Sequence, residues 1–244
     1  MPAPRFVDCH SHVVPSGDDG AQSLADGVAL CADAEEHGTA VLFATPHIWP
    51  HLSLTPERRR GIEGAYAVLR GRVGLDLRLG YELTPTRALL ADDLHGYVLA
   101  GTDCVLLDTP FTGPLDLLVA LGERAQSEGL RPVIAHPERS DAGRDDPHVV
   151  DDLAGRGWLL QVNATSLLGR HGEEADELGW KLVVSGLAAL VASDGHRLSR
   201  AARLDEAFAA VSARVGEGAG RLFDGSALGV EAELFRLARE RRRP

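Results

Sequence analysis

Short apolar runs alternate along the chain with longer stretches in which apolar residues recur every three to four positions. The short runs predict β-strands, because they are rich in aliphatic side chains and are bounded by glycine, proline or polar residues. The longer stretches predict helices that each bury one face. The expected strands cover residues 6–9, 40–44, 75–81, 104–107, 132–135, 158–162 and 188–192, and the expected helices cover residues 23–37, 55–70, 114–128, 146–156, 173–185 and 201–215.

This alternation favours a parallel sheet with helices outside it, that is, an α/β fold. Local signals agree, since Gly38 can end the first helix and Thr55-Pro56 suits the start of the second. The strands number about seven, one fewer than in the regular eightfold barrel, so we expect a distorted (β/α)7-type barrel. No low-complexity linker divides the chain, so we expect a single domain over residues 1–244, closed by two helices after Gly216.

Composition changes this picture little but argues against several classes of function. Of the 244 residues, 44% are hydrophobic and 25% are charged, which is typical of a globular protein. The formal net charge of −11 argues against a general nucleic-acid groove, because phosphate backbones require basic faces. No apolar run reaches the roughly 18 residues that a membrane span needs. The N-terminus also lacks the apolar region of a secretory signal.

Cysteines and C-terminal arginines add two minor expectations. Cys9, Cys31 and Cys104 are odd in number and irregularly spaced, which favours a reducing cytoplasm over a disulfide framework. Arg239 and the arginines at 241–243 suit the last turn of a solvated helix, where cations complement the helix dipole. A contact with a partner or a membrane is the alternative for this basic end.

Residues that commonly bind metals recur where the predicted strands end, and one more lies in a turn. A barrel gathers the C-terminal ends of its strands at one mouth, so we expect these side chains to converge. Each cluster alone is a weak signal, because a histidine at a strand end or an aspartate in a turn has ordinary structural uses. The candidates are His10, His12, Asp19, His47, Glu82, Asp108, His136, Asp194 and His196.

The spacing and type of these residues favour a site with several ions. His10 and His12 are two positions apart in a strand, so both rings can lie on one face. A carboxylate such as Glu82 can bridge two cations, an arrangement used in two-metal hydrolysis. Imidazole and carboxylate ligands suit Mn²⁺, Fe²⁺ or Zn²⁺, and no cysteine is needed as a ligand. The sequence therefore predicts a polynuclear metal hydrolase.

In this order, the motifs resemble those of the PHP (polymerase and histidinol phosphatase) superfamily. Within it, they are most similar to the bacterial metal-dependent protein-tyrosine phosphatases encoded with capsule and exopolysaccharide genes. The resemblance covers about residues 5–210 and is specific as an ordered set. The matching segments are Asp8-Cys9-His10-Ser11-His12 continuing to Gly20, Ala44-Thr45-Pro46-His47, Gly80-Tyr81-Glu82, Ala135-His136-Pro137-Glu138-Arg139, the strand end Gln161-Val162-Asn163 with Ser166-Leu167-Leu168-Gly169, and Ala192-Ser193-Asp194-Gly195-His196.

The resemblance implies up to three metal ions, with Mn²⁺ favoured. It assigns His10, His12, Glu82 and Asp194 to the first ion. Glu82 would bridge to a second ion, which Asp108 and His136 would also hold, and a third would be bound by Asp19, His47 and His196. One departure is visible, because the family usually has Glu where this chain has Asp108. The shorter side chain puts the position and occupancy of the second ion in question.

The resemblance also implies that Arg139 and Arg200 bind phosphate. The planar guanidinium group matches phosphate oxygens, and each arginine follows a candidate ligand cluster. Arg203 competes with Arg200 for the second role. Ala192 and the strand end at 161–163 would form walls of the site.

The expected chemistry is hydrolysis of a phosphomonoester by a water that the ions activate, without a covalent phosphoenzyme. A cysteine phosphatase would need an arginine six positions after its nucleophilic cysteine. Those positions hold Pro15, His37 and Pro110, so this mechanism is excluded. The expected substrate is a phosphorylated protein, such as the tail of a tyrosine kinase, or a small phosphomonoester.

Three other interpretations stay open. The first is a PHP phosphatase for a small metabolite such as histidinol phosphate or a nucleotide. The second is an amidase-like hydrolase, although no lysine at a strand end could serve as its bridging ligand. The third is a regulatory module without turnover, which only Asp108 favours. Trp49, His51 and Phe111 follow ligand clusters and could flank an aromatic ring, although ordinary loop packing is the simpler explanation.

Overall fold

The computed structural model describes residues 5–230. Arg239 and the arginines at 241–243 lie outside this range, so the expectation for the basic end stays untested. Among the described residues, no helix has both the length and the apolar character that crossing a membrane requires.

Parallel strands form the centre of the molecule, as the alternating pattern predicted. They fall into two hydrogen-bonded groups, ordered β1-β2-β4 and β3-β5-β6-β7-β8-β9, and every named pairing is parallel. The strands are β1 (Phe6–Ser11), β2 (Thr39–Ala44), β3 (His47–Ile48), β4 (Asp76–Leu79), β5 (Glu82–Leu83), β6 (Cys104–Asp108), β7 (Arg131–Ala135), β8 (Leu159–Asn163) and β9 (Ala188–Ala192).

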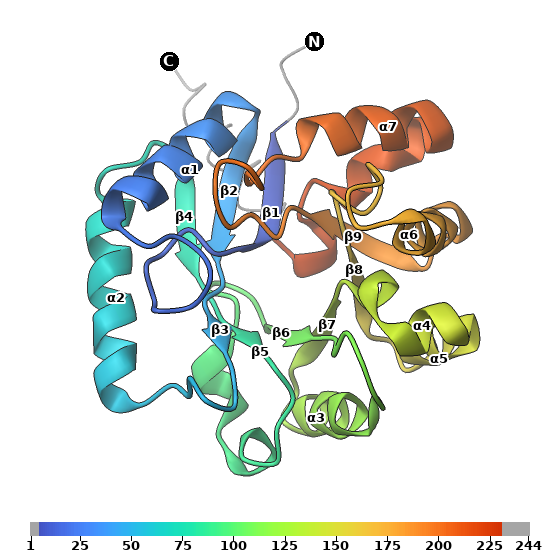
Figure 1. Cartoon of the computed structure of the whole chain (residues 1–244), viewed down its shortest axis with the longest axis horizontal. Helices are drawn as coiled ribbons and strands as arrows, with labels where there is room; N and C mark the ends of the chain where they lie inside the picture. The colour runs from blue at the N-terminus through green and yellow to red at the C-terminus, as the bar shows by residue number, and fades with distance from the viewer. Residues whose placement is uncertain (1–4, 231–244) are drawn as a thin grey trace.

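The helices lie outside the strands, as Figure 1 shows, so the expected α/β arrangement with a parallel sheet and outer helices is confirmed. Ser23 and Thr55 cap the first two helices by accepting hydrogen bonds from backbone N–H groups. The α-helices are α1 (Leu24–Glu36), α2 (Pro56–Arg70), α3 (Asp116–Ser127), α4 (Asp141–Asp145), α5 (Pro147–Gly155), α6 (Glu173–Ser185) and α7 (Asp205–Val215), and the 3₁₀ helices are η1 (Leu89–Ala91), η2 (Leu94–Tyr97), η3 (Pro137–Arg139), η4 (Gly216–Leu222) and η5 (Ser226–Leu228).

Several expected boundaries were wrong. The strand expected at 75–81 ends at Leu79 with β4, and neither β3 nor β5 was expected. Pro46 has no N–H to donate between β2 and β3, which interrupts that ladder. After Gly216, the described residues form the 3₁₀ helices η4 and η5, and the part of the two expected closing helices beyond residue 230 lies outside the described residues. Helix α4 was missed.

The first and last strands meet at their C-terminal ends. Beyond β9, the Asp194 N–H donates to the His10 carbonyl at 2.9 Å, and the His12 N–H donates to the Gly195 carbonyl at 2.7 Å. Ser11 and Gly195 also form a parallel bridge. These contacts bring the residues that follow β9 beside the residues that end β1, although the two segments are far apart in sequence.

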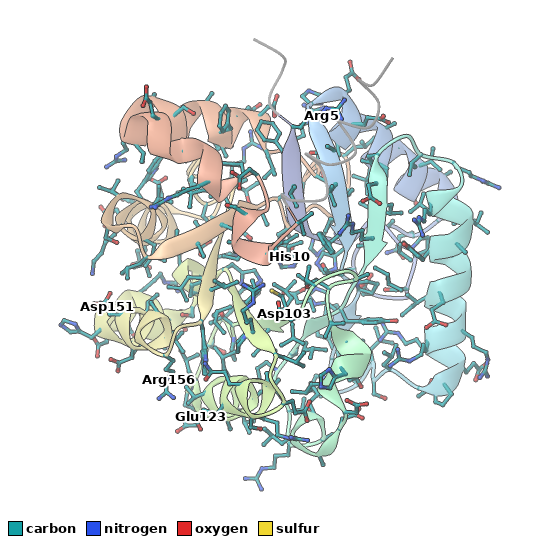
Figure 2. All side chains as sticks on the ribbon, turned by 180° about the vertical axis from the view of Figure 1, so that it is seen from behind. Arg5, His10, Asp103, Glu123, Asp151 and Arg156 are labelled. Carbon is teal, nitrogen blue, oxygen red and sulfur yellow. The ribbon has the colours of Figure 1, made fainter. Side chains whose placement is uncertain are left out.

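The core consists of two apolar clusters. The larger one includes residues of the strands and of the helices outside them, such as Leu30, Ile62 and Leu118. The smaller one gathers residues of β1, β2, β6, β7 and β9, and Cys9 belongs to it. Cys9 is therefore a core residue, which agrees with the alternation of neighbouring side chains along a strand. In Figure 2, His10 lies near the middle of the molecule, whereas Glu123, Asp151 and Arg156 lie at its outer edge.

Candidate metal centre

His10 and His12 place two imidazoles in direct contact at the end of β1. Their Nε2 atoms are 3.2 Å apart, and both residues are fully buried. The ring of His12 also packs against the rings of His47 and His196, with centroids 4.3 and 3.9 Å away. The histidines predicted from three different strand ends therefore meet in one cluster.

Glu82, the first residue of β5, lies at the centre of this cluster. Its Oε2 is 3.2 Å from His10 Nε2, 3.3 Å from His12 Nε2 and 2.8 Å from His47 Nδ1. Its Oε1 is 3.1 Å from His136 Nε2. Glu82 is fully buried, so four imidazoles surround a single carboxylate away from bulk water.

Asp194 and His136 reach the cluster from left-handed backbone conformations, with φ values of 52° and 39°. They are the only described residues other than glycine with positive φ. This conformation is costly for such residues and is typical of functional sites. Asp194 Oδ1 lies 3.4 Å from Nε2 of both His10 and His12.

Asp19 and Asp108 lie at the edges of the cluster. Asp19 Oδ1 is 3.3 Å from His196 Nε2 and 3.6 Å from His47 Nε2, and its side chain is half exposed. Asp108 Oδ1 is 3.7 Å from His136 Nε2, and Thr84 donates its hydroxyl to Asp108 Oδ2 at 2.7 Å. All the predicted candidate ligands are thus brought together.

The donor atoms cluster more tightly in some combinations than in others. In each of four sets, the donor atoms lie within 4.8 Å of one another, which is close enough to hold an ion. These sets overlap and do not separate into the three ligand groups that the resemblance implies. They are His10–His12–Asp194, His10–Glu82–His136, His47–Glu82–Asp108 and His12–His47–His196.

The hydrogen bonds of the cluster leave acceptor atoms facing one another, and this arrangement fits a cation. His10 donates its Nδ1–H to Gln161 Oε1 at 2.9 Å. A neutral His10 ring then has a lone pair on Nε2, which faces the acceptor oxygens of Glu82 and Asp194. Glu82 Oε2 is buried without a hydrogen-bond partner. Acceptors converge in this way around a metal ion.

The pKa values also indicate a site that requires positive charge. Burial lowers the pKa of His10, but the carboxylates of Glu82 and Asp194 raise it above its usual value. Burial and the Glu82 carboxylate raise the pKa of Asp108 to about 8. A divalent ion would replace both protons and allow the carboxylates to stay ionised. The donor set therefore fits the ions that the sequence predicted.

Arg139 and Arg200 converge on one oxygen of Asp194. Arg139 Nη1 lies 3.0 Å from Asp194 Oδ2, and Arg200 Nη2 donates to the same oxygen. Arg200 Nε is buried without a partner, so this guanidinium retains a free donor. Arg203 instead pairs with Asp33 on α1, with Nε and Oδ2 2.7 Å apart. Of the two competing arginines, Arg200 is the one beside the cluster.

Three polar residues support the cluster but were not predicted as part of it. Asp18 accepts the backbone N–H of His47 at 3.0 Å and lies 3.6 Å from His12 Nδ1. Glu138 accepts the Asn163 N–H at 3.0 Å, which ties the turn after β7 to the end of β8. The third is Thr84. The motifs contain Asp18 and Glu138, but no spacing rule distinguishes such residues from ordinary turn residues.

The cysteines are unsuited to nucleophilic catalysis. Cys9, Cys31 and Cys104 are all buried and free. Burial raises the pKa of Cys31 to about 12 and that of Cys104 to about 11. Since the thiolate is the nucleophile, these thiols would be inert near neutral pH.

Imidazole and carboxylate donors gathered at the ends of parallel strands are typical of metal-dependent hydrolases. Residues 6–224 match the family described as capsular polysaccharide synthesis, CpsB/CapC. The chain belongs to this family, and the resemblance noted in its motifs is thereby confirmed.

Two curated relatives carry names that state an activity. The tyrosine-protein phosphatase YwqE of Bacillus subtilis (strain 168) is 28% identical over 208 residues, covering 79% of this chain and 78% of that protein. The tyrosine-protein phosphatase CpsB of Streptococcus agalactiae serotype V is 26% identical over 206 residues, covering 79% of this chain and 84% of that protein.

Solved structures show the same relationship. One solved structure superposes on this chain with a TM-score of 0.83. It belongs to the crystal structures of YwqE from Bacillus subtilis and CpsB from Streptococcus pneumoniae, which are described as "unique metal-dependent tyrosine phosphatases". It is 26% identical and covers 93% of this chain and 95% of its own. An adenine deaminase from Arthrobacter aurescens has a TM-score of 0.56 at 13% identity, covering 97% of this chain and 100% of its own, which shows a shared fold alone.

Proposed function

We propose that this chain is a metal-dependent protein-tyrosine phosphatase. The observation that carries the proposal is the position of Glu82, in contact with four imidazoles beside an aspartate on which two arginines converge. This arrangement offers cation ligands and phosphate-binding donors within one site. The names of the relatives agree with this activity.

The proposed ligands are the candidates that the motifs identified. Up to three divalent ions, with Mn²⁺ favoured over Fe²⁺ or Zn²⁺, would form a trinuclear site. The second ion would be held less tightly than in relatives with a longer carboxylate, because Asp108 is short and also accepts the Thr84 hydroxyl. The ligands are His10, His12, Asp19, His47, Glu82, Asp108, His136, Asp194 and His196.

The protein's own residues would bind and orient the phosphate ester. When bound, the ions activate water near neutral pH and neutralise phosphoryl charge. Arg139 and Arg200 hold phosphoryl oxygens through the guanidinium donors that do not bind Asp194. Gln161 keeps the proton of His10 on Nδ1, so its Nε2 lone pair faces the site.

The leaving group explains why no general acid is required. Attack by water forms a new P–O bond and breaks the bond to the tyrosine oxygen; the water gives one proton to the solvent, and the released phenolate takes one up. A phenolate leaves readily, since the pKa of tyrosine is about 10. The inert cysteines take no part, and no covalent phosphoenzyme is formed.

The proposal also covers the barrel that contains the site, the location of the protein and its substrate. We infer that β2 with β3, and β4 with β5, are two broken strands of a distorted (β/α)7 barrel that β1 and β9 close. One domain over residues 1–244 would contain the whole site.

The free buried cysteines support a cytoplasmic location. The description of the family supports a phosphorylated protein of capsular polysaccharide synthesis, such as a tyrosine kinase tail, as the substrate.

Metal content and substrate preference together test this function. Elemental analysis of the purified protein is expected to find two to three ions per chain. Turnover of a phosphotyrosine peptide should exceed that of histidinol phosphate. His136→Ala should remove most activity, whereas His148→Ala is the matched control, because the His148 side chain is 89% exposed on α5. Fewer than two ions per chain, or a preference for histidinol phosphate, would contradict the proposal.

A further inference from the structure

Phe111 is one of the few large apolar side chains that the described residues leave exposed, with 49% of its surface accessible. It lies in the connection between β6 and α3, which leads away from the candidate ligand Asp108. Its partly exposed ring lies beside the candidate metal cluster and is available for contact with a ligand. The other exposed large apolar residues are Val68, Leu117, Val184 and Leu198.

The connection that carries Phe111 is anchored at two points, to the end of β7 and to the start of α4. The Phe111 carbonyl accepts the Asp141 N–H at 2.8 Å. Two residues earlier, the buried Thr109 hydroxyl donates to the Ala135 carbonyl at 2.5 Å. The backbone at Phe111 is therefore held next to the turn that follows β7.

One side of the Phe111 ring covers the proposed phosphate-binding residue. The guanidinium carbon of Arg139 lies 4.5 Å from the ring centroid, a cation–π distance. The centroid of the His136 ring lies 5.7 Å away. The half-exposed Phe111 therefore lies directly beside a proposed phosphate-binding group.

The shape of an aryl phosphate fits this arrangement. Only one oxygen separates its phosphorus from its aromatic ring. When Arg139 binds the phosphoryl oxygens, the substrate ring must lie nearby and away from the fully buried His10 and Glu82. Phe111 is the aromatic group in contact with Arg139, and offset or edge-to-face aromatic pairs are favourable at centroid distances of about 4.5–7 Å.

We propose that Phe111 forms an aryl-binding subsite that favours aromatic over alkyl phosphate esters. This inference rests on the proposed phosphatase function, because it places the phosphoryl group at Arg139. Phe111 contributes affinity for the ring of the ester and leaves the binding of the phosphoryl group unchanged.

The test compares phenylphosphonate with methylphosphonate, which share a head group and are not hydrolysed. Their dissociation constants are measured by calorimetry on the Mn²⁺-loaded protein. Phe111→Ala is expected to weaken phenylphosphonate binding by about threefold to tenfold and to leave methylphosphonate binding unchanged. Phe111→Trp should retain the preference for the phenyl compound. Leu117→Ala, at a 38% exposed residue of α3, is the matched control and should alter neither constant.

The outcomes separate this inference from the function on which it rests. Equal effects of Phe111→Ala on both compounds, or no effect on either, would overturn the aryl subsite. A phenyl preference that depends on Phe111 supports the subsite even if the protein fails to hydrolyse a phosphotyrosine peptide. That failure would overturn the phosphatase function alone. Thermal unfolding of each variant checks that its fold is intact.

Discussion

At the scale of single residues, Gln161 and Asn163 form a chain of amide hydrogen bonds between two candidate ligands. Gln161 accepts from His10 Nδ1 and donates to Asn163 Oδ1 at 2.8 Å. Asn163 in turn donates to Asp194 Oδ2 at 2.8 Å. Because both amides are fully buried, their orientation fixes the ring of His10 and the carboxylate of Asp194.

Gln161→Leu should lower the affinity for divalent ions by roughly 10- to 100-fold, the usual cost of losing a group that orients a metal ligand. The leucine removes the acceptor that holds the proton of His10 on Nδ1. Calorimetric titration of the metal-free protein with Mn²⁺ measures the change. Gln126→Leu is the control, because Gln126 is an exposed residue of α3. Equal affinities for the two variants would refute this role.

Arg200→Ala should raise KM for a phosphotyrosine peptide by about 10- to 100-fold, since hydrogen bonds to charged groups each contribute roughly 1.5–3 kcal/mol. Arg139→Ala should act in the same direction. Arg203→Ala is the matched control, because Arg203 pairs with Asp33 instead of approaching the cluster. Steady-state kinetics distinguishes the variants, and a comparable loss in Arg203→Ala would show that the assignment of the second arginine is wrong.

At the scale of elements, the alternating pattern was sufficient to predict most helices and strands, because the helices bury one periodic face and strands such as β1 are short apolar runs that are buried throughout. It was insufficient where a strand is broken. Between β4 and β5, a Cβ on Gly80 would lie 2.5 Å from Leu99 Cδ2, so a neighbouring segment restricts this position. Contacts of this kind involve residues distant in sequence and leave no periodic signal.

Two helical glycines give a test of how packing overrides helix propensity. In α1, a Cβ on Gly27 would lie 2.4 Å from the Val13 carbonyl, whereas a Cβ on Gly61 of α2 would meet nothing within 4 Å. Gly61→Ala should raise the free energy of unfolding by about 0.5–1 kcal/mol. Gly27→Ala should lower it by about 1–3 kcal/mol, because the methyl group overpacks the contact. Urea unfolding measures both, and two stabilised variants would contradict the packing argument.

At the scale of the whole molecule, bound ions would link activity to stability. The cluster joins side chains from the ends of β1, β5, β6 and β7 with residues that follow β2 and β9. Burial of Glu82 together with Asp194 has an energetic cost that cations can offset. Ions that bind only the folded chain stabilise it by about 2.7 kcal/mol when their concentration is one hundred times the dissociation constant.

Removal of metal by a chelator should therefore abolish turnover and lower the melting temperature together. Added Mn²⁺ should restore both. The Asp194→Ala variant is the comparison, since it should bind metal weakly and respond little to the chelator. Differential scanning calorimetry with parallel activity measurements checks this prediction. A melting temperature that does not change on chelation of the wild-type protein would count against ions in the buried cluster.

The sequence by itself determined the alternation of strands and helices, the exclusion of a cysteine nucleophile and the identity of the residues that converge. These properties depend on local periodicity and on motifs that can be read within a few residues. Tertiary structure alone decided that Arg200 and not Arg203 meets Asp194, that Thr84 holds Asp108 and that Phe111 covers Arg139. These contacts depend on the relative positions of separate segments, because packing of the whole chain determines which side chains come within a few ångströms.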